Sequence, residues 1–253
     1  MLLSMVNNPS HPQSATSNSA QHSALDSLLP PVLMVHGWGG SHKQTWQKPG
    51  IQTLIEEFGR TVIGVDLLGH GEAAKPHDPL AYEDISLPIR DLAKNSPVDA
   101  VGFSLGAIAL LHAATINPKM FRKLVLIGIG DKIFEPHDPQ ETNRIISGID
   151  KTAEQDDTLA HQFGNYARQT GNDVDALRAV LQRPRGETFT KQNASAIVAE
   201  VLVIVGDRDF VLPADQLVAA FKTSRFKLLK NCDHFASTEN FTMIDELLEF
   251  LKN

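Results

Sequence analysis

The sequence has one cysteine, no long apolar run and no block of basic residues. A lone Cys232 excludes an intrachain disulfide, which fits a reducing compartment, and we expect a cytoplasmic protein. No apolar run approaches the length of a transmembrane helix, so no membrane span is expected. Acidic residues outnumber basic ones by 30 to 23 without any lysine or arginine stripe, so nucleic acid is not an expected partner.

The remaining composition is that of an ordinary globular domain. The chain has 253 residues, of which 42% are hydrophobic, enough for one α/β domain with a sizeable core. The stretch from Asn7 to about Asp26 is rich in Ser, Asn, Gln and His without periodicity, and Met1–Val6 is too short for the apolar part of a signal peptide. We predict a disordered or loosely attached leader over residues 1–27 and a single domain over residues 28–253.

Apolar runs alternate with helical patterns from Pro31 onward. The helical patterns have apolar residues at i, i+3, i+4 and i+7, as in the stretch Ile51–Phe58, and a further helix is expected to begin near Pro213. The runs are short and apolar throughout, which is typical of strands in a parallel sheet covered on both faces. Six runs are predicted to be strands: Val32–Val35, Thr61–Val65, Val98–Phe103, Leu124–Ile127, Val201–Val205 and Phe226–Leu229.

Residues 131–194, after the fourth predicted strand, interrupt this alternation. They contain no convincing strand, whereas Leu159, Phe163 and Tyr166 recur at helical spacing, as do Val174 and Leu177. About sixty residues exceed an ordinary crossover between strands. We therefore predict a small helical cap inserted into the domain.

The segment Gly102-Phe103-Ser104-Leu105-Gly106 lies directly between a predicted strand and a predicted helix. Flanking glycines let the backbone double back sharply, and such a turn exposes the serine at the edge of the sheet. The alternative is a plain glycine-rich turn, since short patterns of this kind also occur by chance. The segment predicts a nucleophilic serine only if its partners are present.

An acid and a histidine follow later strands in the order that activation of Ser104 needs. Asp209 lies in the loop after the fifth strand and His234 follows the sixth. The carboxyl ends of parallel strands share one edge of a sheet, so all three side chains can meet there. We favour Asp209 over Asp207, which is nearer the strand and free to bond backbone amides. Taken singly, each acid could be a helix cap or turn former, and His234 a surface histidine.

Acyl transfer also needs backbone donors for the developing oxyanion. The Leu105 N–H, at the start of the helix after Ser104, is one candidate donor. The Trp38 N–H, in the segment His36-Gly37-Trp38-Gly39-Gly40 after the first strand, is the other. This chemistry requires no cofactor.

Two copies of the tetrapeptide Pro-His-Asp-Pro, at residues 76–79 and 136–139, raise the possibility of a metal site. Paired prolines favour turns, and no third ligand is spaced nearby. We therefore predict no metal.

The chain resembles the α/β-hydrolase superfamily, specifically compact bacterial carboxylesterase-like members with a helical cap. The matching segments are His36-Gly37-Trp38, residues 66–71, the serine turn, Gly206–Pro213 and Asp233-His234-Phe235. The resemblance implies an α/β-hydrolase fold with Ser104 as nucleophile, His234 as general base, Asp209 as orienting acid, and Trp38 and Leu105 as oxyanion donors. Asp66 and His70 match a segment that is structural in most relatives. The two strands that usually open this fold have no counterpart, and a serine disfavours the aspartate-based dehalogenases and epoxide hydrolases.

We therefore expect a serine hydrolase that cleaves small carboxylic esters with short or medium acyl groups. The candidate pocket residues are Phe163, Tyr166, Leu212 and Phe235, although the two in the cap could equally be core residues. Lactone opening and carbon–carbon bond cleavage stay open, and a basic residue such as Arg168 or Arg183 near the substrate would favour the latter. A non-catalytic ligand receptor is the third hypothesis, and the oligomeric state stays open.

Overall fold

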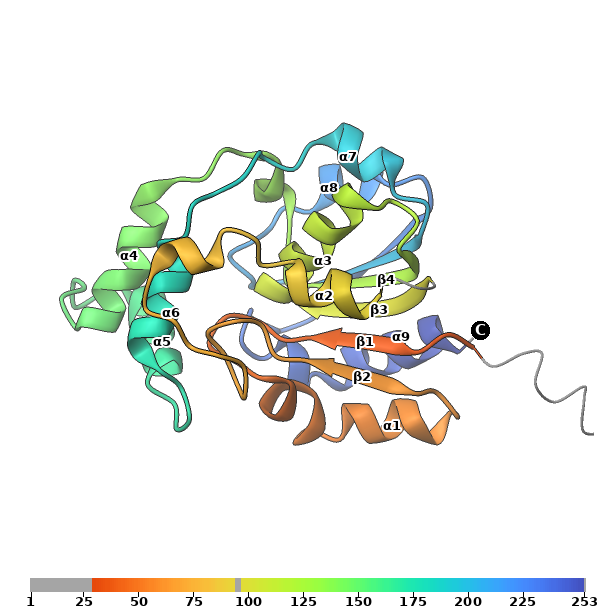
Figure 1. The fold of residues 1–253 in the computed structure, drawn as a ribbon, viewed down its shortest axis with the longest axis horizontal. Helices are drawn as coiled ribbons and strands as arrows, with labels where there is room; N and C mark the ends of the chain where they lie inside the picture. Colours follow the sequence, from red (N-terminus) through yellow and green to blue (C-terminus); the bar gives the residue numbers. More distant parts are fainter. Residues whose placement is uncertain (1–28, 94–96, 253) are drawn as a thin grey trace, which may run out of the picture.

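The computed structural model describes residues 29–93 and 97–252, so the predicted leader lies outside the described residues. Six strands form one sheet in the order β2-β1-β3-β4-β5-β6, and every neighbouring pair is parallel (Figure 1). The strands are β1 Val32–Val35, β2 Val62–Val65, β3 Val98–Phe103, β4 Phe121–Ile127, β5 Glu200–Gly206 and β6 Ser224–Leu229. This confirms the predicted parallel α/β architecture.

Helices cover both faces of the sheet, and β1 shows how the sequence achieves this. Leu33 and Val35 join the hydrophobic cluster under α2 and α3, whereas Val32 and Met34 join the cluster under α1 and α9. Successive strand residues point to opposite faces, so a continuously apolar strand is buried on both sides. The covering helices are α1 Ile51–Glu57, α2 Leu87–Leu92, α3 Leu105–Ile116, α8 Asp215–Ala220 and α9 Phe241–Leu251, with short helices at Lys43–Gln47, Pro79–Tyr82, Asp131–Phe134 and Ser237–Glu239.

The chain between β4 and β5 includes residues 131–194, which we call the insertion, and it contains four longer helices, the last ending at Ala196, and no strand among the described residues. They are α4 Pro139–Asp150, α5 Thr158–Ala167, α6 Val174–Leu181 and α7 Lys191–Ala196. In Figure 1, α4, α5 and α6 gather beyond the end of the sheet to which the arrow of β1 points, whereas α7 lies near α8. That the insertion works as a cap stays a prediction.

Several element boundaries differ from those expected, and two of them, the starts of α8 and β4, have a clear physical reason. Helix α8 begins at Asp215 rather than at Pro213. The Pro213 carbonyl accepts the Asp131 N–H (2.8 Å), and the Leu217 N–H, which would close that helical turn, donates to the Asp131 carboxylate (2.8 Å). Strand β4 begins at Phe121, whereas its expected start was Leu124. The expected start was too late because the charged residues 122 and 123 interrupt the apolar pattern.

Candidate active site

Ser104 occupies a strained turn between β3 and α3. Its φ of 50° and ψ of −114° are rarely adopted by residues other than glycine. A Cβ atom at Gly102 would lie 2.7 Å from the Ala107 backbone nitrogen, and one at Gly106 would lie 2.5 Å from the carbonyl oxygen of Val35. Both positions therefore require glycine, which is why this pentapeptide folds into a sharp elbow with its serine half-buried at the end of β3.

The structure brings Ser104, His234 and Asp209 together. The His234 Nε2 atom lies 3.0 Å from the Ser104 Oγ atom, and Nδ1 lies 3.0 and 2.9 Å from the two carboxylate oxygens of Asp209. His234 and Asp209 are 3% and 4% exposed. With the Nδ1 proton donated to the carboxylate, Nε2 presents a lone pair to the serine hydroxyl. The arrangement can accept the serine proton and stabilise the resulting imidazolium.

Asp207 binds the backbone instead. Its carboxylate accepts the N–H groups of Asn231 (3.0 Å) and Cys232 (3.1 Å), in the loop that leads from β6 to His234. These hydrogen bonds lower the pKa of the Asp207 carboxyl. Asp207 thus holds the histidine loop, and Asp209 contacts the imidazole.

The two predicted oxyanion donors have no hydrogen-bond partner among the described residues. Within residues 29–93 and 97–252, neither the Trp38 N–H nor the Leu105 N–H donates a hydrogen bond, although both residues are buried. Leu105 is the first residue of α3, where the helix dipole favours negative charge. Val35 pairs with Gly102 across β1 and β3, so the loop after β1 lies beside the elbow. Buried N–H groups are normally bonded, so these two are available to a ligand.

Aromatic rings surround the imidazole. The Phe210 and Phe235 rings lie 4.5 and 5.6 Å from the His234 ring, centroid to centroid. From α5, the Phe163 ring contacts Phe235 at 5.3 Å, Phe210 at 5.9 Å and Trp38 at 5.7 Å. These contacts connect the insertion with the loops that follow three different strands.

Of the remaining pocket candidates, Tyr166 joins this ring cluster and Leu212 does not. The Tyr166 ring lies 5.7 Å from that of Phe235. Leu212 is half-buried and packs against the larger hydrophobic cluster. Phe210 was missed by the sequence analysis, and its place directly after Asp209 was the one signal for it.

Asp66 and His70 belong to a buried support beneath the loop after β1. His36 donates from Nδ1 to the Gly37 carbonyl (2.7 Å) and accepts the Leu67 N–H at Nε2 (3.1 Å), and its ring lies 5.0 Å from that of His70. Burial lowers the pKa of His36 to about 4 and that of His70 to about 3, so both are neutral near pH 7. The Asp66 carboxylate accepts the backbone N–H groups of residues 42 and 72.

The two Pro-His-Asp-Pro segments start helices. Asp78 accepts the Leu80 N–H (3.0 Å), and Asp138 accepts the Gln140 N–H (2.8 Å) as the N-cap of α4. The described residues contain no group of three or more histidine, cysteine or acidic side chains arranged to hold a metal ion. They also contain no helix with the length and apolar character needed to cross a membrane.

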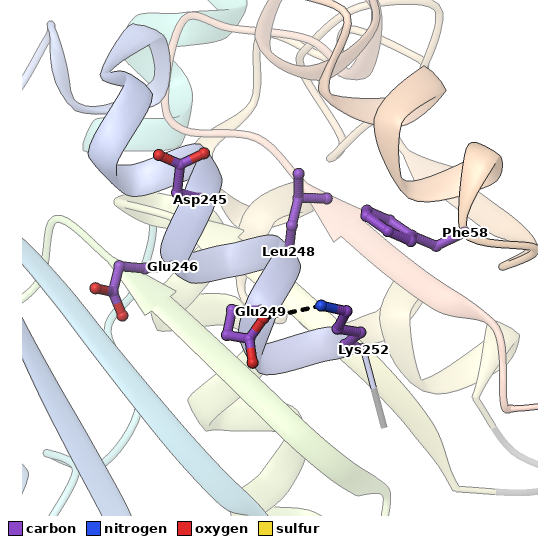
Figure 2. Close-up of a pocket in the computed structure, with 6 residues that line it drawn as sticks. All are labelled: Phe58, Asp245, Glu246, Leu248, Glu249 and Lys252. Atoms are coloured by element: carbon purple, nitrogen blue, oxygen red, sulfur yellow. Dashed lines mark hydrogen bonds and ion pairs between the residues drawn. The ribbon is translucent and has the colours of Figure 1, made fainter.

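A surface pocket of about 410 Å³ lies between Phe58, after α1, and helix α9. Figure 2 shows Phe58 and Leu248 facing each other across it, with an ion pair between Glu249 and Lys252 (3.3 Å) along its edge. None of the predicted site residues lines this pocket. It therefore lies apart from the predicted site residues.

Comparison with known proteins agrees with the observed fold. Residues 30–183 match the family described as the alpha/beta hydrolase fold. The esterase Rv0045c of Mycobacterium tuberculosis is 30% identical over 140 residues, which cover 53% of this chain and 41% of that protein, so the chain spans less than half its length. The 2-hydroxy-6-oxo-6-(2'-aminophenyl)hexa-2,4-dienoic acid hydrolase of Metapseudomonas resinovorans is 23% identical over 234 residues, which cover 83% of this chain and 79% of that protein. The solved structure of the esterase EaEST from Exiguobacterium antarcticum has the same fold, with a TM-score of 0.68, 21% identity, and coverage of 88% and 92% of the two chains.

Proposed function

Because the chain belongs to the alpha/beta hydrolase fold family, we propose that it is a serine hydrolase cleaving carboxylic esters with short or medium acyl groups. The observation that carries the proposal is the pair of contacts at His234, 3.0 Å to the Ser104 hydroxyl and 2.9 Å to the Asp209 carboxylate. The name of the Mycobacterium tuberculosis relative, an esterase, supports the same substrate class.

The proposed reaction has two halves. Ser104 Oγ attacks the ester carbonyl carbon while His234 Nε2 takes the hydroxyl proton, and the carbonyl oxygen becomes an oxyanion. Collapse of this intermediate breaks the bond to the alcohol, which leaves with the proton from His234. Water then attacks the acyl-serine with the same histidine as base, which releases the acid and restores the serine hydroxyl.

The N–H groups of Trp38 and Leu105 donate to no other group in the described part of the chain, which supports the proposed role of these residues as oxyanion donors. Removing one such donor typically costs about 3–4 kcal/mol of transition-state stabilisation. The rings of Phe163, Phe210 and Phe235 support a confined acyl site, which favours short and medium acyl groups over long ones.

The name of the Metapseudomonas resinovorans relative makes carbon–carbon bond cleavage the second candidate. A basic residue positioned for a substrate carboxylate, such as Arg168 or Arg183, would favour that chemistry. The guanidinium of Arg168 instead donates to the carbonyls of Gly148 (3.3 Å) and Ile149 (3.0 Å), and that of Arg183 to the Val180 carbonyl (2.7 Å). Ester cleavage is therefore the better supported reaction.

The test combines labelling by a fluorophosphonate probe with hydrolysis of a series of p-nitrophenyl esters. We expect the unaltered protein to be labelled once and to hydrolyse acetate to octanoate esters, whereas Ser104→Ala and His234→Ala lose labelling. Ser104→Ala should lower kcat by about 10⁴-fold or more. Ser195→Ala, at an exposed serine on α7, is the matched control and should behave like the unaltered protein. Full ester turnover by Ser104→Ala would refute the proposal.

A further inference from the structure

The loop that follows β1 is rich in glycine, so its peptide groups need to be held in place. Gly37, Gly39 and Gly40 surround Trp38, and Gly39 has a φ of +74°. Glycine visits positive and negative φ values with similar ease, so peptides next to glycine reorient readily. A peptide N–H that serves as an oxyanion donor must point in one direction before the reaction begins.

A series of hydrogen bonds leads from the insertion to this donor. Asn172 Nδ2 donates to the Gly39 carbonyl (2.7 Å), and the N–H of the same peptide, which belongs to Gly40, donates to the Gly37 carbonyl (3.1 Å). The Gly37 carbonyl, which also accepts the His36 Nδ1–H (2.7 Å), shares a peptide with the Trp38 N–H. A trans peptide is planar with its carbonyl and N–H on opposite sides, so fixing each carbonyl fixes the direction of the N–H in the same unit.

Other contacts hold the same loop against the insertion. Asn172 Nδ2 also donates to the Tyr166 carbonyl (3.2 Å) near the end of α5, and a Cβ atom at Gly39 would lie 2.7 Å from the Tyr166 ring. The Trp38 indole N–H donates to the Leu177 carbonyl (3.0 Å) in α6. Asn172 is half-buried, in the loop between α5 and α6.

We propose that Asn172 is a positioning residue that, through the Gly39–Gly40 and Gly37–Trp38 peptides, directs the Trp38 N–H toward the oxyanion. The proposal rests on the proposed function, because it requires an oxyanion to form beside Ser104. The insertion would then have two roles. It lines the site with Phe163, and it holds the Trp38 N–H, one of the two oxyanion donors, in its working direction.

The test uses Asn172→Ala and Asn172→Asp in the full chain. Asp has the same shape as Asn but no N–H to donate, and its charge repels the Gly39 carbonyl. Gln169→Ala is the matched control, since Gln169 is an exposed amide of the same loop for which no side-chain hydrogen bond occurs among the described residues. An interaction made only in the transition state lowers kcat and kcat/KM equally. We expect both Asn172 variants to lose about 10- to 100-fold in kcat on a p-nitrophenyl ester, with KM within about threefold of the control.

Fluorophosphonate labelling provides a second measurement. The endpoint counts folded sites, whereas the rate depends on stabilisation of the oxygen on phosphorus by the same N–H donors. We expect Asn172→Ala and Asn172→Asp to reach full labelling at a rate at least about tenfold lower than that of Gln169→Ala. Incomplete labelling together with a lowered Tm would show that Asn172 serves only folding, which overturns the proposal.

The two proposals can fail separately. If the unaltered protein hydrolyses esters through Ser104 while the Asn172 variants match Gln169→Ala in kcat and labelling rate, the role of Asn172 is refuted and the esterase proposal stands. If the unaltered protein hydrolyses no ester, the esterase proposal fails, and the labelling rates still decide whether Asn172 positions the donor. Absence of labelling in the unaltered protein overturns both.

Discussion

Replacing Asp209 by Asn tests whether Asp209, rather than its neighbour Asp207, is the acid that orients His234. The substitution keeps the size of the side chain and removes the negative charge that lies 2.9 Å from His234 Nδ1. When the imidazole takes the serine proton, this charge stabilises the cation by about 6 kcal/mol at an effective dielectric constant of about 20. Because 1.36 kcal/mol corresponds to about tenfold in rate, Asp209→Asn should lower kcat by about 10⁴-fold.

Asp207→Asn is the matched comparison. Asp207 accepts two N–H groups of the loop that leads to His234, and an Asn oxygen can still accept one of them. We therefore expect this variant to keep kcat within about tenfold and to unfold at a lower temperature. The assay is initial-rate hydrolysis of one p-nitrophenyl ester by all three proteins, with Tm measured for each. An Asp209→Asn protein that retains more than about a tenth of kcat, or an Asp207→Asn protein that loses as much as Asp209→Asn, would refute the assignment.

Two further predictions concern buried ionisable groups. Asp99→Ala removes a fully buried carboxylate that is bonded to Arg60 (2.5 Å) and Arg122 (2.9 Å). We expect this substitution to lower the free energy of unfolding, measured in urea, by about 3–5 kcal/mol. A loss below about 1 kcal/mol would contradict this prediction. The pKa of His70 is lowered to about 3 in the folded chain, so the unfolded chain binds more protons as the pH falls below 6.5. Lowering the pH from 6.5 to 4.5 should therefore lower the free energy of unfolding. We expect this loss to be about 2 kcal/mol smaller in His70→Gln than in the unaltered protein. Urea titrations of both proteins at pH 6.5 and pH 4.5 measure the two losses, and equal losses would exclude a contribution from His70.

The sequence was most informative where local geometry and chemistry coincide. The central strands β1 and β3 were predictable because parallel strands buried on both faces are apolar throughout, and the serine elbow because its two glycines cannot be replaced without a clash. The grouping of Ser104, Asp209 and His234 followed from one topological fact, that parallel strands end at the same edge.

The sequence was least informative in the insertion. Helix α4 was missed because Pro136–Pro139 was interpreted as a turn, although Asp138 as N-cap and Pro139 as first residue are typical of a helix start. The bond from Asn172 to Gly39 joins residues 133 positions apart. No pattern along the chain encodes such a contact, because it depends on how α5 and α6 pack against the loop after β1.

The span of the serine–histidine contact affects how activity arises during synthesis. Ser104 and His234 are 130 residues apart, and His234 follows β6, which is synthesised after the other five described strands of the sheet. Pairings between distant segments form slowly, since a long stretch of chain must be ordered before they do. A nascent or half-refolded chain that has formed only β1 to β4 has an elbow serine but lacks the histidine that we propose as its base. Regain of turnover should therefore report completion of the whole sheet, whereas helix content can recover earlier.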